Sequence, residues 1–526
     1  MRDRRAKGFL LAAILWCVIL VVLGASYRYL VQPYLNARLR GTTGSESIYK
    51  DEIIIAADSF SGYAILRSDA MRNELKSKGI QLTVADDRAD YTARLQSLKD
   101  KTAHMAVFTI DSLITAGAKA GDFPGSIVML IDETKGGDAI VARKDSVANL
   151  QDLNDPNAQI HLTPDSPSEF LARVVIAHFH LPNLPEKWQV NADGSAAVYN
   201  ALRNARAGEK KAFVLWEPYL SRALEETPSH VLIDSSKLKG FVVDVLVAQR
   251  EFLRDRPDLV QAVLEAYFRA AYTIGQKADG MTTLVREDAA RTSLDKLDAN
   301  QAGKVVAGIR WKNTLENYAH FGLVPSTAQG GLDHIEDMIQ NILDVLLKTG
   351  SLRADPLPGQ HATLFYKQTL QELQSQNFHP GSALNMITGL GPGLSDLEPV
   401  RSDASAAPLS GDQWKQLKPV GELQTPPIVF IRGSARISVQ SERDLERLAK
   451  RLTSFPEYYL RIIGQTRAEG DPEANRTLAE QRGKAAADLL KARGLDAARI
   501  QTEATPTRIQ SGEAQSVVFE VGQIPY

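Results

Sequence analysis

Short apolar runs and helical stretches alternate along most of the chain. From residue 52 onward, each apolar run is followed by a stretch with helical periodicity. This alternation is typical of α/β proteins, in which helices cover parallel strands. It predicts strands at 52–57, 81–85, 103–108, 139–143, 159–162, 212–216 and 244–249, and long amphipathic helices at 257–274 and 332–347.

The pattern changes twice in the second half of the chain. Prolines and glycines interrupt residues 379–427, which we interpret as a linker of turns and extended segments. The α/β alternation then resumes, with strands expected at 428–431, 459–463 and 517–521 and helices at 441–452 and 475–493. We therefore expect a large domain at 50–378 and a small second domain at 428–526.

The N-terminal residues have the most biased composition of the chain. Four basic residues precede residues 9–25, a run of 17 residues without a charge. A run of that length suits a membrane-spanning helix, and the basic residues before it favour a cytoplasmic N-terminus. We expect a cytoplasmic segment at 1–7, an uncleaved transmembrane signal anchor at 8–27 and a juxtamembrane linker at 28–49. Cleavage after the small residues at 24–26 is the alternative.

Charge and cysteine content exclude several classes of function. The 61 Lys and Arg residues nearly balance the 63 Asp and Glu residues, and the net charge of −2 argues against a nucleic-acid partner. The single cysteine, Cys17, lies inside the apolar run, which excludes intramolecular disulfides and cysteine-based metal sites. We expect no metal ion and no cofactor.

Polar residues that follow the predicted strands are the candidate ligand-binding groups of the large domain. Ser166, Pro167 and Glu169 suit the first positions of a helix, whose free backbone N–H groups can attract an anion. Glu217 ends a buried strand, where a carboxylate needs either a cationic ligand or an internal Lys or Arg. Comparable strand-to-helix turns carry Asp58, Ser59, Thr109 and Asp111. Helix capping, or core packing for Tyr63, is the alternative role for these residues.

Several motifs of residues 50–378, taken in order, resemble the periplasmic solute-binding proteins of the nitrate, sulfonate and thiamine-precursor group. The motifs lie at 58–63, 75–90, 95–111, 139–143, 150–153, 216–219 and 244–248. The resemblance implies a two-lobed α/β fold of type II, whose lobes close by hinge motion on a ligand in the cleft. It also implies ligand-binding roles for Asp58, Ser59, Tyr63, Thr109, Asp111, Ser166, Ser168 and Glu217.

The acidic candidates and the lone cysteine limit the chemistry of this domain. Asp58, Asp111 and Glu217 favour an amine or mixed-charge ligand over a bare oxyanion. Thiamine-pyrimidine synthases are related to these binding proteins and resemble enzymes whose iron chemistry depends on cysteine. The only cysteine of this chain, Cys17, lies in the predicted membrane segment, which argues against such an activity. The chain also lacks serine-hydrolase and zinc-protease motifs, so we expect no enzymatic activity.

Residues 428–526 resemble the OmpA-like peptidoglycan-associated domain. Residues 461–470 correspond to the family's Gly-His-Thr-Asp-x-x-Gly loop, and residues 475–482 to its Asn-x-x-Leu-Ser-x-x-Arg helix. In that family the loop Asp and the helix Arg hold the charged diaminopimelate end of the wall peptide, which implies peptidoglycan-binding roles for Asn475 and Arg482. An internal salt bridge is the alternative for Arg482. The chain departs from the family at Gln465 and Arg467, which replace His and Asp.

Together these features predict a single-pass protein of the bacterial inner membrane with its bulk in the periplasm. We expect it to capture a small polar or charged molecule for an ABC-type permease, while its last domain associates with peptidoglycan. The alternative is an envelope scaffold or sensor, in which occupancy of the cleft signals to a membrane complex.

Overall fold

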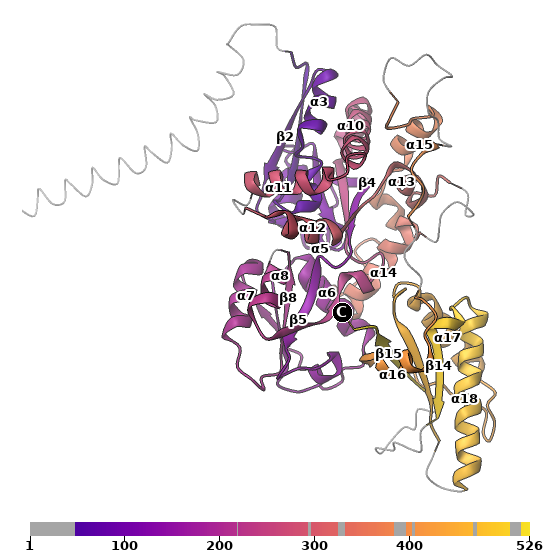
Figure 1. Ribbon diagram of the computed structural model, residues 1–526. Coiled ribbons are helices and arrows are strands. Elements are labelled where there is room, and N and C mark those ends of the chain that lie inside the picture. Colours follow the sequence, from indigo (N-terminus) through magenta and orange to yellow (C-terminus); the bar gives the residue numbers. More distant parts are fainter. Residues whose placement is uncertain are drawn as a thin grey trace, which may run out of the picture.

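The computed structural model describes residues 48–217, 219–292, 296–324, 332–382, 396–401, 406–466, 471–504 and 517–525. These residues form two α/β lobes and a smaller α/β domain beside the second lobe (Figure 1). The predicted mixed α/β architecture is therefore confirmed. Within these ranges no helix is both long enough and apolar enough to span a membrane. The predicted anchor at 8–27 lies outside the described residues.

The first lobe is built on a six-stranded sheet with the order β11-β4-β10-β3-β1-β2. Its strands are β1 (Asp51–Ala57), β2 (Ile80–Asp86), β3 (Met105–Thr109), β4 (Gly125–Thr134), β10 (Val243–Gln249) and β11 (Ile309–Trp311). Every residue of β3, β4 and β10 is buried, so most positions on both faces of these strands are apolar. The helices of this part are α3 (Asp69–Ser77), α4 (Tyr91–Lys99), α5 (Ile110–Ala120), α9 (Arg250–Asp255), α10 (Pro257–Gly275), α11 (Gly280–Thr292), α12 (Ala299–Ala307), α13 (Thr314–His320), α14 (Ile335–Lys348) and α15 (Gln368–Ser375).

The second lobe is built on a five-stranded sheet with the order β7-β6-β8-β5-β9. Its strands are β5 (Asp138–Arg143), β6 (Gln159–Leu162), β7 (Gln189–Asn191), β8 (Lys211–Trp216) and β9 (Ser229–Asp234). Its helices are α6 (Pro167–His178), α7 (Gly194–Asn204) and α8 (Tyr219–Glu226).

The chain crosses between the two lobes twice, at residues 135–137 and 235–242, which we call the first and second crossovers. Each crossover delivers a strand that inserts antiparallel into the sheet it reaches. The first delivers β5, which lies between β8 and β9, and the second delivers β10, which lies between β3 and β4. The two lobes therefore repeat one strand order, and both crossovers pass through the same boundary between them.

The C-terminal domain has a four-stranded sheet with the order β12-β15-β13-β14. Its strands are β12 (Lys418–Glu422), β13 (Tyr459–Gly464), β14 (Ile500–Ala504) and β15 (Val517–Gln523), and its helices are α16 (Gly411–Gln416), α17 (Val439–Leu452) and α18 (Pro472–Ala492). Helix α18 packs closely on β13 because Gly464 has no side chain. A Cβ atom at Gly464 would lie 2.0 Å from the carbonyl oxygen of Ala479.

Two expectations for this part of the chain are wrong in detail. Residues 428–431 form no strand; Phe430 makes a single bridge to Ile437, and Val429 and Ile431 are exposed. Within the predicted linker, α16 and β12 are regular elements, and β12 pairs antiparallel with β15. The C-terminal sheet therefore takes an edge strand from a segment that its proline and glycine content had marked as a linker.

The C-terminal domain contacts both the second lobe and the second crossover. Phe179, at the end of α6, forms a bridge with Leu423 just after β12. The backbone N–H of Lys239, in the second crossover, donates to the Ser454 carbonyl at 2.9 Å. Lys237 forms an ion pair with Glu457 at 2.5 Å. The small domain therefore touches one of the two segments about which the lobes would move.

Candidate functional site

A cavity of about 820 Å³ lies between the two lobes. The first lobe lines it with the turns after β1 and β2 and with Asp244 of β10. The second lobe lines it with Asp138 of β5 and with the loops that precede α6, α7 and α8. Polar loops at strand ends, contributed by two lobes that share two crossovers, are the usual setting of a ligand site in an open α/β protein.

The structure brings six of the eight predicted ligand residues to this cavity. They are Asp58, Ser59, Tyr63, Ser166, Ser168 and Glu217. Thr109 and Asp111 do not belong to the lining and are buried at the start of α5. The Thr109 hydroxyl donates to Ser112, and burial raises the pKa of Asp111 to about 7. Binding roles for all eight residues stay predictions.

Asp58 already has a partner inside the protein. Its carboxylate accepts a hydrogen bond from the Phe60 backbone N–H at 2.8 Å and pairs with the Arg94 guanidinium at 2.8 Å. Arg94 is fully buried and also pairs with Asp87 at 2.5 Å. Asp58 is therefore held in an internal cluster of one guanidinium and two carboxylates, and it shapes the turn after β1.

Tyr63 and Asp244 line the floor of the cavity and form a second buried group with Asp132, which is not part of the lining. The Tyr63 hydroxyl donates to Asp244, which lies opposite Asp132 in the β10–β4 ladder. No N–H or hydroxyl group among the described residues donates to Asp132. Burial and the neighbouring Asp132 raise the pKa of Asp244 well above its usual range, and burial also raises the pKa of Asp132. Two adjacent buried carboxyl groups cannot both ionise cheaply.

Asp138 and Glu217 add two further carboxyl groups from the second lobe. Asp138 opens β5 opposite Trp216 of β8, so Glu217, the next residue, lies beside it. Burial raises the pKa of Asp138 to about 6, and the charge of Glu217 acts in the same direction. Burial also raises the pKa of Glu217, although the Ser221 N–H and hydroxyl both donate to its carboxylate.

The start of α6 confirms the predicted helix boundary but not a side-chain cap. Ser166 is the N-cap residue with extended backbone and Pro167 is the first helical residue, as expected. The Ser166 hydroxyl, however, donates to the Thr163 carbonyl at 2.7 Å and caps nothing. The Ser168 hydroxyl, which is fully buried and belongs to the cavity lining, has no hydrogen-bond partner among the described residues.

Aromatic side chains form much of the remaining lining. They are Phe60, Tyr63, Tyr91, Trp216 and Tyr219. The Phe60 and Tyr63 rings meet edge to face, with centroids 5.3 Å apart.

Asp138 and Asp244, which line the cavity, are not among the ligand residues predicted from the sequence. The available signal was an aspartate within the first two positions of a largely apolar strand.

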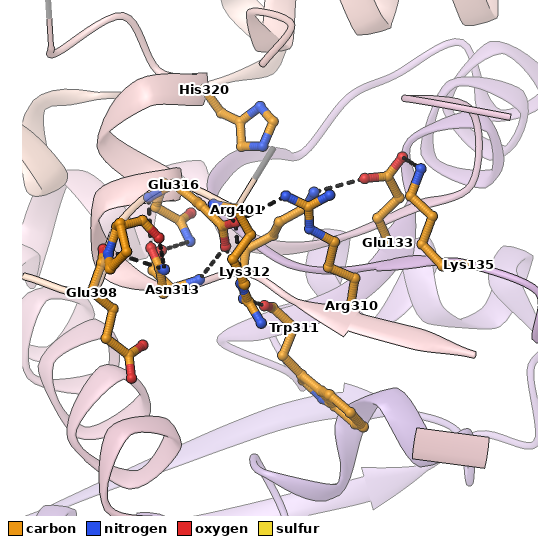
Figure 2. Close-up of polar contacts among 12 residues, drawn as sticks. Glu133, Lys135, Arg310, Trp311, Lys312, Asn313, Glu316, His320, Glu398 and Arg401 are labelled. Carbon is orange, nitrogen blue, oxygen red and sulfur yellow. Dashed lines mark hydrogen bonds and ion pairs between the residues drawn. The ribbon is translucent and has the colours of Figure 1, made fainter. Parts of the chain in front are cut away.

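A network of buried ion pairs ties the crossovers together behind the cavity (Figure 2). Glu133, near the end of β4, pairs with Lys312 at 2.7 Å and with Lys135 of the first crossover at 3.3 Å. The same carboxylate accepts the backbone N–H of Gly240, in the second crossover, at 2.8 Å. Burial alone would raise the pKa of Glu133, but the two ammonium groups outweigh it and hold this pKa well below its usual range.

The predicted peptidoglycan-binding residues lie on α18 of the C-terminal domain. Arg482 is half-buried, donates to the Ser434 carbonyl at 3.3 Å and stacks over the Phe430 ring at 5.1 Å. Burial lowers its pKa. Among the described residues it has no carboxylate partner, so the internal salt bridge considered as the alternative is absent there. Asn475 is half-buried one turn into the same helix, and Arg467 lies outside the described residues.

Neither lobe offers a ready metal site within the described ranges, where no three His, Cys, Asp or Glu side chains are grouped to hold an ion. The site therefore combines surplus acidic groups, aromatic walls and an organic-ligand-sized cavity.

Two family models match parts of the chain. Residues 429–512 match the OmpA family, and residues 197–285 match the NMT1-like family. No curated protein matches the chain. Both resemblances read from the sequence are thus confirmed at the level of family models.

Solved structures similar to the chain are mostly binding proteins. The periplasmic aliphatic sulphonate binding protein SsuA from Escherichia coli is 15% identical, covers 59% of this chain and 97% of its own, and has a TM-score of 0.45. The alkanesulfonate-binding protein SsuA from Xanthomonas axonopodis pv. citri bound to MOPS is 14% identical, with 61% and 99% coverage and a TM-score of 0.46. The desulfurization enzyme DSZB is 13% identical, with 62% and 99% coverage and a TM-score of 0.43.

Proposed function

We propose that this chain is a membrane-anchored solute-binding protein of the bacterial periplasm. The observation that carries the proposal is the cavity of about 820 Å³ that two lobes share across two crossovers. Such a cleft can close on a small polar molecule by hinge motion, because only the crossovers connect the lobes covalently. The repeated insertion of an antiparallel strand after each crossover supports the type II form of this fold.

We further propose a partner and a cellular setting for this chain. The chain captures its ligand without chemical conversion and delivers it to an ABC-type permease. The apolar run at 9–25 anchors it in the inner membrane as a single pass, with both domains in the periplasm. The C-terminal domain positions it near peptidoglycan, using Arg482 and Asn475 on α18.

Ligand capture is tested by thermal-shift screening of the full chain in detergent against amines, sulfonates, nitrate and thiamine precursors. A genuine solute-binding protein gains stability with at least one compound, because a ligand that binds the folded state alone raises the unfolding temperature. Small-angle scattering with that compound is expected to show a smaller radius of gyration as the lobes close. Lack of any shift across the panel would contradict the proposal.

Peptidoglycan association is tested by sedimentation with purified sacculi. Arg482→Ala is expected to bind less than the wild-type chain, since Arg482 stands at the family's arginine position and pairs with no carboxylate among the described residues. Arg476→Ala is the matched control, because Arg476 lies on the same helix but pairs with Glu473 and Glu480 in solvent. Equal sedimentation of all three proteins would remove Arg482 from the wall-binding site.

A second candidate, an envelope sensor, is favoured by one specific contact. The C-terminal domain bonds directly to the second crossover through the Lys239–Ser454 backbone hydrogen bond and the Lys237–Glu457 ion pair. Lobe motion about that crossover would therefore move or strain the small domain. Hydrogen exchange of the full chain, with and without the stabilising compound, distinguishes the two functions. A sensor changes protection at 451–458 as well as at the cleft, whereas a pure transport protein changes it at the cleft alone.

A further inference from the structure

The side chains of the cavity have a marked excess of negative charge. The first lobe contributes four carboxylates, Asp58, Asp86, Asp90 and Asp244, and the second contributes three, Asp138, Asp193 and Glu217. Arg88 is the one basic side chain in the lining of the described cavity, and it is exposed at the turn after β2. A cleft lined by one sign of charge attracts ligands of the opposite sign.

Three of these carboxyl groups are buried or half-buried and lack a cationic partner in the described chain. Asp138 and Asp244 are buried and Glu217 is half-buried, yet none of them forms an ion pair with a described Lys, Arg or His. Asp58 differs, because it pairs with Arg94. Lys304, whose charge acts on Glu217, pairs with Glu225 at 2.7 Å.

These groups also lie near one another. Asp138 and Glu217 sit at adjacent strand positions in the second lobe, and the charge of Asp138 reaches Asp132, the partner of Asp244. Carboxyl groups held together away from water and without a counter-charge are costly, and a protein resolves that cost by protonation or by binding a cation. The unpartnered hydroxyl of buried Ser168 adds a lone-pair acceptor in the same lining.

The geometry suits an organic cation better than a metal ion. No group of three carboxylate or histidine ligands among the described residues is spaced to hold a metal. The volume of about 820 Å³ is in the range of pockets for organic molecules. Aromatic faces from Tyr63, Trp216 and Tyr219 can contact an ammonium group or its alkyl chain.

We propose that the cavity binds a small aliphatic amine, with an ammonium group seated among Asp138, Glu217 and Asp244. The inference rests on the proposed solute-binding function and names its ligand class. It differs from the sulfonates named for the two similar binding proteins. Burial raises the pKa of Asp138 to about 6, so this group gives up its proton as an ammonium group binds, and amine affinity rises with pH through about pH 6.

The test is isothermal titration of the full chain in detergent with 1,4-diaminobutane, spermidine and ethanolamine, and in parallel with ethanesulfonate, butanesulfonate and nitrate. At least one amine is expected to bind at one site, about tenfold or more tighter than any of the anions. The neutral isosteres Asp138→Asn and Glu217→Gln are each expected to weaken that amine about tenfold or more. Asp234→Asn is the matched control, because Asp234 is a buried carboxyl group of the same sheet outside the cavity; its affinity should stay within about twofold of wild type.

The outcomes separate the ligand class from the function. Amine binding that the isosteres weaken and that strengthens with pH supports the inference. Tight binding of an anion without amine binding overturns the cationic class and leaves solute capture intact. Amine binding unchanged in Asp138→Asn and Glu217→Gln places the amine elsewhere and overturns the site. Absence of binding by any compound overturns both the inference and the proposed function.

Discussion

Two neighbouring acids on β4 lie in opposite electrostatic settings. Asp132 is 0% exposed and Glu133 is 3% exposed, and because successive strand residues point to opposite faces, they face different parts of the molecule. Asp132 lies against the cavity floor beside Asp244, whereas Glu133 lies against the crossovers beside Lys312 and Lys135 (Figure 2). Burial raises the pKa of Asp132, but the two lysines lower that of Glu133.

The difference shows that burial alone does not decide the charge of an acid in this protein. Glu133 is a structural ion, because its carboxylate satisfies two ammonium groups and a crossover N–H. Asp132, on the other face, has no hydrogen-bond donor among the described residues and lies opposite Asp244, which lines the cavity. One face of β4 therefore carries a compensated ion, whereas the other carries a buried carboxyl group without such compensation.

The largest expected effect is on the paired face. Lys312→Met keeps most of the apolar stem but removes the ammonium group from a pair that is 0% and 4% exposed. We expect the free energy of unfolding to fall by about 3–5 kcal/mol, because Glu133 is left as a buried charge with weaker compensation. Asp132→Asn, one residue from Glu133, is expected to change it by less than about 1 kcal/mol or to stabilise, since no cation is lost.

Urea denaturation of the full chain, followed by tryptophan fluorescence, measures both variants. The double variant Glu133→Gln with Lys312→Met should recover part of the loss, because no unpaired charge is then buried. Equal losses in Lys312→Met and Asp132→Asn would show that the two faces do not differ in the way the contacts indicate.

The second effect is the pH dependence of the unpaired face. The pKa of Asp138 is about 6 in the folded protein and near 3.8 in the unfolded chain. Between about pH 4 and pH 6 the Asp138 carboxyl group is ionised in the unfolded chain but still protonated in the folded protein. The stability that Asp138 contributes is therefore complete below pH 4 and is lost as pH rises through 6. The loss amounts to about 2–3 kcal/mol.

Asp138→Asn removes that contribution to the pH dependence. The variant is expected to match the wild-type unfolding temperature at pH 4 and to exceed it at pH 7, since asparagine has no charge to bury. Thermal unfolding at pH 4, 5, 6 and 7 checks this. A variant that follows the wild-type curve at every pH would mean that Asp138 ionises without cost in the folded chain.

Much of the fold is predictable because apolar runs mark its buried strands. Strands β1, β3, β5, β8, β10 and β13 lie within a few residues of their predicted positions. Strand β4 was missed, although its run at 127–131 carries the same signal. Strand β12 has only two buried residues, so its pattern is weak, and its place in the sheet comes from pairing with β15. The predicted strand at 428–431 lacks a partner beyond the Phe430–Ile437 bridge.

Site residues that directly follow a strand could be predicted from the sequence. Site residues whose position depends on which strands pair could not. Ser166 and Glu217 lie in loops that directly follow predicted strands, and both line the cavity. Asp138 and Asp244 lie on the strands delivered by the crossovers, and no local pattern shows that these strands insert antiparallel at the lobe boundary. The internal partner of Asp58 was equally hidden, because Arg94 is distant in sequence and reaches it only in the folded lobe.

A third effect tests how tightly the cavity floor is packed. A Cβ atom at Gly62 would lie 2.4 Å from Asp132 Oδ2 and 2.4 Å from the Phe60 ring. Gly62→Ala is therefore expected to destabilise the protein by about 2 kcal/mol through overpacking. Gly303→Ala is the control, since Gly303 lies in α12 with open space around the position of a Cβ atom. This variant should be neutral or slightly stabilising. Similar unfolding temperatures for both variants would show that the residues around Gly62 can shift to accommodate a methyl group at little cost.

The smallest effect concerns an ion pair that resembles Lys312–Glu133 in geometry but not in burial. Lys237 and Glu457 join the second crossover to the C-terminal domain at 2.5 Å, with side chains 14% and 35% exposed. Water screens such a pair, so a double-mutant cycle with Lys237→Met and Glu457→Gln should give a coupling of about 1 kcal/mol or less. The same cycle at Lys312 and Glu133 should give several times more, because that pair is cut off from solvent. Comparable couplings would show that the shared lysine–glutamate geometry, and not solvent exclusion, sets the strength of both pairs. The expected weak coupling between Lys237 and Glu457 means that this contact can break and re-form at little cost, while the buried network keeps the crossovers in place.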